Sequence, residues 1–294
     1  MLLVTGATGL NGSALLRRLS AMHIPVRALV RSRDRAAAIA ALPHVEIVVG
    51  DMAVPASLAG PLAGVERVML ISPSAPNMLE VQTNVIEAAR SAGVRHVVKL
   101  SGIIPDIASA FRYARMHGEI EQRLEASGMA FTQLRAGEFM PSYFRQVPNI
   151  VGKGLLMLPM ADARIASIDI GDVAEVAALA LTEPGHEGRT YPLTGPAALS
   201  MAEVAVELSA VTGKPIRYVN VDPEQMRQDQ LAALHRRCIV RALRRAAERQ
   251  GSDRLAAGLR AARPSGDELC ELCRPQRGDL SRRGAGAENL GAKL

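Results

Sequence analysis

The chain has 294 residues, 48% of them hydrophobic, which predicts one or two domains with a sizeable core. No apolar run approaches the roughly 18 residues of a membrane span, no charged leader precedes the first apolar residues, and three cysteines are too few for a disulfide framework. We therefore expect a cytoplasmic protein. The formal charge of +6 comes from the tail, because residues 231–294 hold 14 Lys+Arg and 7 Asp+Glu, whereas residues 1–230 hold 21 and 22. The nearly neutral body argues against a nucleic-acid partner.

Runs of Val, Ile and Leu alternate along the first half of the chain with segments of helical spacing. Leu15, Leu16 and Leu19 form one apolar stripe, and another lies within residues 79–89. Strands are predicted at 2–4, 26–30, 45–49, 67–71 and 94–101. Continuous apolar strands between amphipathic helices are typical of a parallel sheet covered on both faces, so we expect an α/β protein with a doubly wound parallel-sheet Rossmann fold.

The second half continues this alternation and contains two helix-start signals. We predict a helix at 114–127 and strands at 131–134, 165–170 and 216–221. Asp172 is expected to begin a helix with Glu175 as its capping-box partner. Ser200 and Glu203 repeat the device ahead of a helix that ends near Thr212.

A glycine-rich loop joins the first predicted strand to the first helix. Gly6, Gly9 and Gly12 are spaced GxxGxxG in the segment TGATGLNG. Glycine lets the chain turn tightly, lets the backbone approach a pyrophosphate, and lets the helix pack closely on its strand. The helix N-terminus adds free N–H groups and the positive end of its dipole. This context predicts a dinucleotide-binding loop rather than an ordinary turn.

The residues after the second strand distinguish the two nicotinamide dinucleotides. An acidic residue there binds the ribose 2′-hydroxyl of NAD, whereas an arginine accommodates the 2′-phosphate of NADP. Arg31 follows the strand directly, with Arg33 and Arg35 close by, and Asp34 is the acidic rival. We therefore favour NADP(H) over NAD(H), with Arg31 on the phosphate and the other two arginines as solvated surface.

Further cofactor contacts are expected at the ends of the following strands. Asp51 either accepts a hydrogen bond from the adenine amino group or caps the next helix, and Met52 packs on the adenine ring. Ser72 would lie near the nicotinamide ribose. The complete set of predicted cofactor residues is Gly6, Thr8, Gly9, Leu10, Asn11, Gly12, Arg31, Asp51, Met52, Ser72, Lys99, Gly137 and Phe139.

Several segments together resemble the NmrA-like family, an atypical branch of the short-chain dehydrogenase/reductases. They are the glycine loop, Arg31, Gly50-Asp51, KLS at 99–101, LRAGEFM at 134–140, IDIGDVA at 168–174 and GRTYPLTGP at 188–196. The resemblance covers residues 1 to about 225. The family includes bacterial NAD(P)H-dependent quinone and azo-dye reductases, and also non-catalytic proteins that sense the redox state of the cofactor. The resemblance therefore implies cofactor binding but leaves the reaction open.

The candidate catalytic residues depart from the pattern of typical short-chain dehydrogenases. Those enzymes place a tyrosine and a lysine four residues apart on one helix face, beside a serine. Here Ser101 ends the fifth strand, but Tyr113 is followed four residues later by His117, and the lysine is missing. A neutral histidine replaces a fixed positive charge weakly. Ser101, His117 and Tyr113 are therefore the candidates, with ordinary helix surface as the alternative for Tyr113 and His117.

Lys99 stands within an apolar strand, where an unpaired ammonium group is costly to bury. Either the ammonium finds a carboxylate or a carbonyl beneath the sheet, which we favour, or it reaches towards the cofactor.

Reduction of a quinone relaxes the need for a catalytic acid, because hydride adds to an acceptor that is already electrophilic. Proximity to the nicotinamide would then suffice. The residues expected to wall such a site are Gly137, Phe139, Met140, Tyr143 and Phe144. Phe139 and Met140 fit a core position equally well. The sequence thus predicts an NADPH-dependent oxidoreductase for a small, apolar, electron-poor acceptor of quinone or azo type, with a non-catalytic NAD(P)-sensing protein as the alternative that the missing lysine favours.

We expect residues 1–150 to form the NAD(P)-binding Rossmann domain and residues 151–225 a small α/β region on the substrate side, interleaved with the Rossmann core. Residues 231–294 are basic and free of aromatic residues, and we expect them to pack no core. Translation out of frame, or a basic appendage for an acidic partner, would account for this composition. Cys270 and Cys273 form a CxxC without a second pair, so no metal site is predicted.

Overall fold

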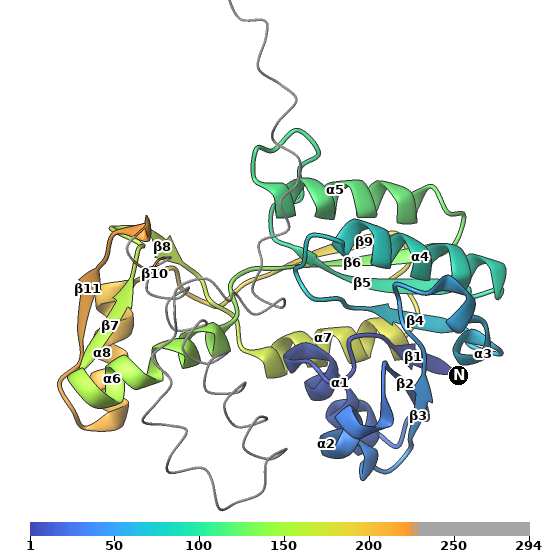
Figure 1. Cartoon of the computed structure of the whole chain (residues 1–294), viewed down its shortest axis with the longest axis horizontal. Coiled ribbons are helices and arrows are strands. Elements are labelled where there is room, and N and C mark those ends of the chain that lie inside the picture. The colour runs from blue at the N-terminus through green and yellow to red at the C-terminus, as the bar shows by residue number, and fades with distance from the viewer. Residues whose placement is uncertain (225, 227, 229–294) are drawn as a thin grey trace, which may run out of the picture. The chain divides into compact units, whose positions relative to one another are not determined.

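A computed structural model describes residues 1–224, 226 and 228. Its centre is a sheet of seven parallel strands in the order β3-β2-β1-β4-β5-β6-β9 (Figure 1). The strands are β1 (Leu2–Val4), β2 (Val26–Val30), β3 (Val45–Val49), β4 (Arg67–Leu70), β5 (His96–Gly102), β6 (Ala130–Ala136) and β9 (Arg189–Leu193). The strand order reverses between β1 and β4, which is the topological switch point of a Rossmann fold. The predicted fold class is confirmed.

Alternate side chains of each strand point to opposite faces of the sheet, and each face has its own apolar cluster. On β1, Leu2 and Val4 belong to the first cluster and Leu3 to the second. Figure 1 shows α1 and α7 on one side of the sheet and α4 and α5 on the other. The helices around the sheet are α1 (Leu10–Ala21), α2 (Ala37–Ala40), α3 (Ala59–Leu62), α4 (Met78–Ser91), α5 (Arg112–Glu125) and α7 (Ile170–Thr182), with the 3₁₀ turns η1 (Arg33–Ala36) and η2 (Pro55–Ser57).

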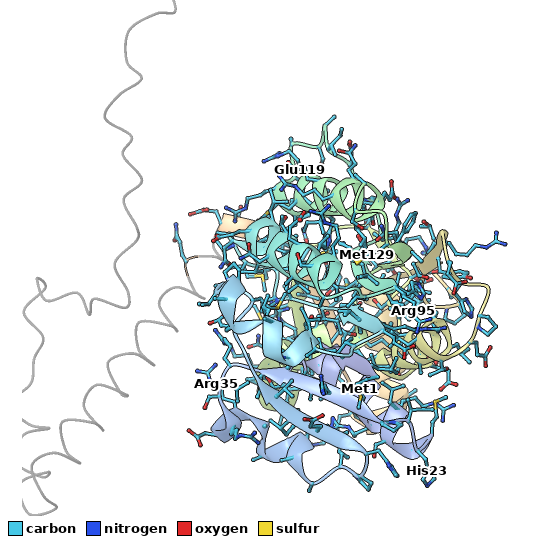
Figure 2. The ribbon with its side chains drawn as sticks, turned by 90° about the vertical axis from the view of Figure 1, so that its right-hand side faces the viewer. Met1, His23, Arg35, Arg95, Glu119 and Met129 are labelled. Carbon is cyan, nitrogen blue, oxygen red and sulfur yellow. The ribbon has the colours of Figure 1, made fainter. Side chains whose placement is uncertain are left out.

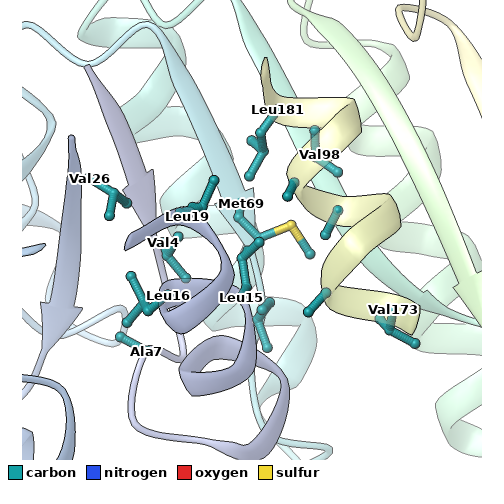
Figure 3. Packing of buried hydrophobic residues seen from close by; sticks show 14 of the residues in the cluster. Val4, Ala7, Leu15, Leu16, Leu19, Val26, Met69, Val98, Val173 and Leu181 are labelled. Atoms are coloured by element: carbon teal, nitrogen blue, oxygen red, sulfur yellow. The ribbon is translucent and has the colours of Figure 1, made fainter. Parts of the chain in front are cut away.

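Helices α1 and α7 pack together on the first face (Figure 3). Leu15 of α1 and Leu181 of α7 are buried around Met69 of β4. Burial of one such leucine contributes about 2 kcal/mol. At the surface, Arg18 of α1 donates from Nη2 to Oε1 of Glu175 on α7 at 2.6 Å. These contacts fix α1, whose first turn follows the glycine loop.

The amino and carboxyl ends of the parallel strands carry different kinds of residues. Figure 2 shows the face with Met1, Arg95 and Met129, which directly precede β1, β5 and β6 and so mark the amino ends of the strands. At this end Glu66 pairs with Arg95 at 2.9 Å and with the amino group of Met1 at 3.8 Å. The predicted binding residues lie at the opposite, carboxyl ends, where doubly wound sheets bind their ligands.

Residues 140–220 add a smaller set of elements around a core of their own. The turn η3 (Met140–Gln146) leads into α6 (Val147–Lys153), and a further helix is α8 (Met201–Thr212). Two short sheets pair β7 (Leu155–Leu158) with β11 (Arg217–Asn220), and β8 (Arg164–Ile165) with β10 (Leu199–Ser200). The buried residues of this core are Leu156, Met201, Ala205 and Ile216. Helix α7 and strand β9 come from the same stretch of chain, but α7 packs on the main sheet and β9 is one of its strands. The elements of the main sheet and those of the smaller core therefore alternate along the sequence.

Residues 1–219 form one compact unit, and the domain boundary at residue 150 stays a prediction. Among the described residues, no helix has the length and apolarity to cross a membrane. The character of the tail and the CxxC motif concern residues outside those described.

The expected strand at 165–170 and the helix start at Asp172 are wrong. Strand β8 has only two residues, and α7 begins at Ile170. The side chain of Asp169 accepts a hydrogen bond from the backbone N–H of Gly171 at 2.6 Å and so caps the helix earlier.

The second predicted capping box is confirmed, whereas strands β7, β9 and β10 were not predicted. Ser200 accepts from the backbone of Glu203, whose carboxylate in turn accepts from the backbone N–H of Ser200. Strand β9, at the edge of the main sheet, was not predicted because its sequence RTYPL mixes charged, polar and proline residues.

Candidate cofactor and active site

The glycine loop after β1 is closely packed. Gly6 has a φ of +59°, a conformation that favours glycine. A Cβ on Gly12 would lie 2.3 Å from the carbonyl oxygen of Gly6, so a larger residue does not fit. Gly9 donates its N–H to the same carbonyl at 2.9 Å. The loop therefore holds the first turn of α1 tightly against the end of β1.

The N-terminus of α1 is open to a ligand. Its N-cap is Gly9, which offers no side chain to the free N–H groups, and the first turn has no acidic residue. Thr8 and Leu10 are exposed beside it. The side-chain Oδ1 of Asn11 is buried and has no hydrogen-bond partner within the described residues. Free backbone donors at a helix N-terminus fit the diphosphate of a dinucleotide.

Thr5 ties the glycine loop to β4, and the sequence analysis did not single it out. Its side chain is fully buried, and its Oγ1 donates to the carbonyl of Ile71 at 2.7 Å and accepts from the N–H of Ile71 at 2.8 Å. These bonds continue the β1–β4 pairing beyond its last backbone partners. The sequence signal that could have identified Thr5 is its position as a hydroxyl residue between an apolar strand and a glycine.

Arg31 lies at the carboxyl end of β2 and is exposed. Within the described part of the chain no ion pair neutralises it. Arg33, Asp34 and Arg35 follow in η1 and are exposed as well. Asp34 has only a long contact with Ser32, at 3.4 Å between oxygen atoms. A guanidinium group is thus free at the position where a 2′-phosphate is read.

Asp51 closes a turn after β3. Its Oδ1 accepts from the N–H of Ala53 at 2.9 Å. The alternative that Asp51 caps the next helix is wrong, because the N-cap of η2 is Val54. Met52 is half-buried and packs against the second cluster.

Ser72 follows β4 and is held from α4. Its hydroxyl oxygen accepts from Nε2 of Gln82 at 2.7 Å. Gln82 is buried, and its Oε1 has no partner within the described residues. The contact fixes the Ser72 side chain at the switch point of the sheet.

A hydrogen-bonded cluster of three side chains lies towards the carboxyl end of β5. Nζ of Lys99 is 2.8 Å from Oγ of Ser101 and 3.1 Å from Nδ1 of His117. Oγ of Ser101 is 3.5 Å from the same nitrogen. Lys99 and Ser101 share one face of β5 because they are two residues apart, and α5 brings His117 onto that face. The structure thus brings together two predicted catalytic residues and one predicted cofactor residue.

Lys99 is fully buried, and this sets its charge. Desolvation lowers the pKa of Lys99 to about 7, against the nearby carboxylate of Glu121, which raises it. The expectation that its ammonium meets a carboxylate or carbonyl is wrong, because its hydrogen-bond partners are a hydroxyl and an imidazole. The side chain has 0% exposure, and the expected contact of Lys99 with the cofactor stays a prediction. As the side chain is placed here, Lys99 can act on a bound molecule only through its partners.

His117 is neutral at physiological pH. Burial and the neighbouring charge of Lys99 lower the pKa of its imidazole to about 3. Its ring lies over Gly102 at the end of β5, where an added Cβ would be 3.0 Å from Cδ2. The backbone of Gly102 therefore sets the position of the ring.

Two further charged residues, Glu121 of α5 and Arg135 of β6, lie near Lys99, and sequence reasoning missed both. Glu121 is buried and pairs with Arg135 of β6 at 2.7 Å. Gln133, which is the register partner of Lys99 on β6, is fully buried, and both its amide atoms lack partners within the described residues. Polar residues at alternate positions of an apolar strand were the signal that this face is not purely hydrophobic.

Tyr113 does not join the cluster. Its ring packs edge-on against Phe111 at 5.8 Å between centroids, with the guanidinium of Arg112 at 5.2 Å. Its hydroxyl makes no hydrogen bond within the described residues. The ring is partly buried against the second cluster, as in the alternative of an ordinary helix position, and the catalytic role of Tyr113 stays a prediction.

The segment after β6 contributes both core and exposed residues. Gly137 continues the pairing with β9 through its N–H, and Phe139 packs against the first cluster as a partly buried residue. Met140 and Phe144 are 42% and 68% exposed, and Tyr143 packs on the core of the smaller elements. Of the five residues predicted to line the acceptor site, Met140 and Phe144 thus have solvent-exposed apolar side chains.

Comparison with protein families matches residues 1–249 to the NmrA-like family. The chain belongs to this family. The matched residues extend beyond position 225, where the resemblance was expected to end, and include the beginning of the basic tail.

Several relatives are named reductases or oxidoreductases. The chain is 40% identical over 228 residues to an NAD(P)H azoreductase from Xenophilus azovorans, covering 78% of this chain and 79% of the relative. It is 34% identical to quinone oxidoreductase 2 from Escherichia coli, covering 75% and 78%. The structure of an E. coli NADPH-dependent quinone oxidoreductase complexed with NADPH matches with a TM-score of 0.70 and 33% identity, covering 80% and 82%. A Citrobacter triphenylmethane reductase complexed with NADP(H) matches with a TM-score of 0.71 and 28% identity, covering 79% and 83%.

No group of three or more His, Cys, Asp or Glu suited to a metal ion occurs among the residues that the structure describes.

Proposed function

We propose that this protein is an NADPH-dependent oxidoreductase that transfers hydride to a small, apolar, electron-poor acceptor of the quinone or azo type. The observation that carries the proposal is the open N-terminus of α1 behind a loop that only glycine fits, at the switch point of the sheet. Membership of the NmrA-like family and the named activities of the relatives support it.

The nicotinamide cofactor would supply the hydride. For the chain's own part, the backbone donors of residues 10–12 would bind the diphosphate. Ser72, oriented by Gln82, would contact the ribose on the nicotinamide side. Ser101 and His117 would then face the reacting end of the cofactor from β5 and α5.

The choice of NADPH over NADH rests on Arg31. An exposed guanidinium without an ion pair can bind a 2′-phosphate with charge-assisted hydrogen bonds, each contributing about 1.5–3 kcal/mol. Asp34, the acidic rival, lies in η1 rather than directly after β2. We expect Arg31→Ala to raise the dissociation constant for NADPH at least about tenfold and to leave that for NADH unchanged. A titration in which wild-type protein binds NADH more tightly than NADPH would contradict the assignment.

The acceptor class is inferred from the exposed apolar side chains that follow β6. Met140 and Phe144 offer exposed apolar side chains without a charged group of their own. A flat apolar molecule would bury such surface at about 25 cal/mol per Å². An acceptor that is already electrophilic needs correct placement more than strong acid catalysis.

The deciding experiment measures turnover and binding side by side. Nicotinamide absorbance is followed in the presence of a quinone and azo panel, and NADPH binding is titrated on the same preparation. We expect NADPH to be consumed with at least one acceptor. Binding without consumption would instead indicate a protein that senses the cofactor.

A further inference from the structure

We propose that Lys99 is the proton source of this site and that it acts through His117, whose Nε2–H delivers the proton to the reduced acceptor. The inference rests on the proposed function, because it supplies the proton that follows hydride transfer. His117 would be the catalytic residue in contact with the acceptor, and Lys99 a positioning residue that also holds the proton.

The hydrogen bonds determine where the protons lie. Lys99 in its charged form has only donors, so the nitrogen of His117 at 3.1 Å from Nζ must accept. That nitrogen is Nδ1, and a neutral imidazole that accepts at Nδ1 carries its hydrogen on Nε2. The oxygen of Ser101, 2.8 Å from Nζ, accepts a second hydrogen bond and keeps its own O–H for another partner. Lys99 therefore fixes the tautomer of His117.

The ring is placed so that Nε2 can serve a ligand. Nδ1 faces the buried ammonium, whereas Nε2 makes no hydrogen bond within the described residues. The ring lies beside Gly102 at the carboxyl end of β5, where an added Cβ would be 3.0 Å from Cδ2 and 3.5 Å from Nε2. His117 is only partly buried, in contrast to Lys99, which is fully covered. The imidazole thus lies between the buried ammonium group of Lys99 and the carboxyl end of the sheet, where ligands bind.

The proton transfer balances without any further reactant. Hydride addition leaves the acceptor with one additional electron pair and a negative charge on oxygen or nitrogen. As the N–H bond at Nε2 breaks and its hydrogen bonds to that atom, Nδ1 takes a proton from Nζ of Lys99. The imidazole is left as the other neutral tautomer and Lys99 as a neutral amine. After the product leaves, Nε2 takes a proton from water while Nδ1 returns its proton to Lys99.

The charges around Lys99 leave its proton mobile. Glu121 on α5 favours the ammonium form, and Arg135 on β6 opposes it. The other facing groups are Ser101, His117 and the neutral Gln133. Burial brings the pKa of Lys99 to about 7, so near neutral pH the group can both lose and regain a proton.

The first test requires neither cofactor nor turnover. The full-length protein is labelled with ¹⁵N-histidine, and the signals of His117 are assigned by comparison with His117→Asn. We expect the Nε2–H tautomer of His117 at pH 7. We expect Lys99→Met to raise the pKa of His117 above about 3, because desolvation, the larger cause, remains but the neighbouring positive charge is gone. A wild-type His117 that carries its hydrogen on Nδ1 would overturn the proposal, even if the Lys99 variant does not fold.

The second test uses the pH profile of acceptor reduction. We expect the wild-type rate to fall as the pH rises through about 7, and Lys99→Met to lose this dependence together with at least about tenfold of the rate at pH 6, at an unchanged dissociation constant for NADPH. Glu121→Gln should move the fall to lower pH and Arg135→Gln to higher pH. Lys214→Met, at an exposed lysine, is the matched control and should change nothing. Shifts in the same direction for the Glu121 and Arg135 variants would contradict the relay.

The two proposals fail in different ways. If wild-type protein binds NADPH but reduces no acceptor, the proposed function fails. If wild-type protein reduces an acceptor while Lys99→Met retains both the rate and the pH profile, the relay alone is refuted.

Discussion

The buried lysine makes a quantitative prediction about stability and pH. In the folded protein the pKa of Lys99 is about 7, and its usual value in an unfolded chain is 10.5. Between these values the unfolded chain binds one more proton than the folded protein. The free energy of unfolding therefore rises with pH across this window, by about 1.4 kcal/mol per pH unit. Below pH 7 both states carry the proton, and this contribution is flat.

Lys99→Met removes the titrating group and keeps most of the side-chain volume. We expect the stability of the wild type relative to this variant to increase by roughly 2 kcal/mol from pH 7 to pH 9, because Lys99 is half deprotonated at pH 7 in the folded protein. The assay is reversible urea unfolding of both proteins at several pH values, in which the groups they share cancel in the difference. Lys214→Met, at an exposed lysine, serves as the control and should give a constant difference. If the difference in free energy of unfolding between the wild type and Lys99→Met stays constant within about 1 kcal/mol from pH 7 to pH 9, the conclusion that Lys99 is buried with a depressed pKa is refuted.

Three further substitutions test the parts of the site separately. Gly12→Ala puts a Cβ against the loop backbone and should abolish measurable NADPH binding in a fluorescence titration, whereas Gly60→Ala, which has open space, should bind as the wild type does. Thr5→Val removes a buried hydroxyl with two hydrogen bonds to β4 and should lower the free energy of unfolding by about 1–3 kcal/mol in urea; no loss would mean that these bonds do not hold the loop. Gly102→Ala should displace the His117 ring and slow acceptor reduction with little change in the dissociation constant for NADPH, and an unchanged rate would argue against this placement of the ring.

The central strands of the fold could be predicted because their burial leaves a local trace. Strands β1 and β2 have the expected boundaries, since their runs of Val, Ile and Leu are covered on both faces, and the edge strand β3 was found because it keeps such a run as well. Strand β9 has no such run, because an edge strand tolerates charged residues and a proline. The start of α7 was misplaced because two aspartates, Asp169 and Asp172, both suit an N-cap, and only the backbone conformation selects between them.

The cofactor half of the site follows from sequence more directly than the catalytic half. The glycine loop is contiguous, and its chemistry depends on spacing within eight residues. The partners of Lys99 depend instead on how α5 lies across β5, because His117 is 18 positions further along the chain. The missing lysine at the helix position suggested a weakened site. The structure places a lysine on the neighbouring strand, at hydrogen-bond distance from the histidine that stands in its place.

The most direct test of the account is the stoichiometry of a single reaction mixture. Full-length protein is mixed with a limiting amount of NADPH and excess quinone in the absence of oxygen, and oxidised cofactor and hydroquinone are both quantified. The account predicts one hydroquinone for each NADPH consumed, and no reaction with Gly12→Ala. Bound NADPH that stays reduced in the presence of every quinone and azo acceptor would contradict it.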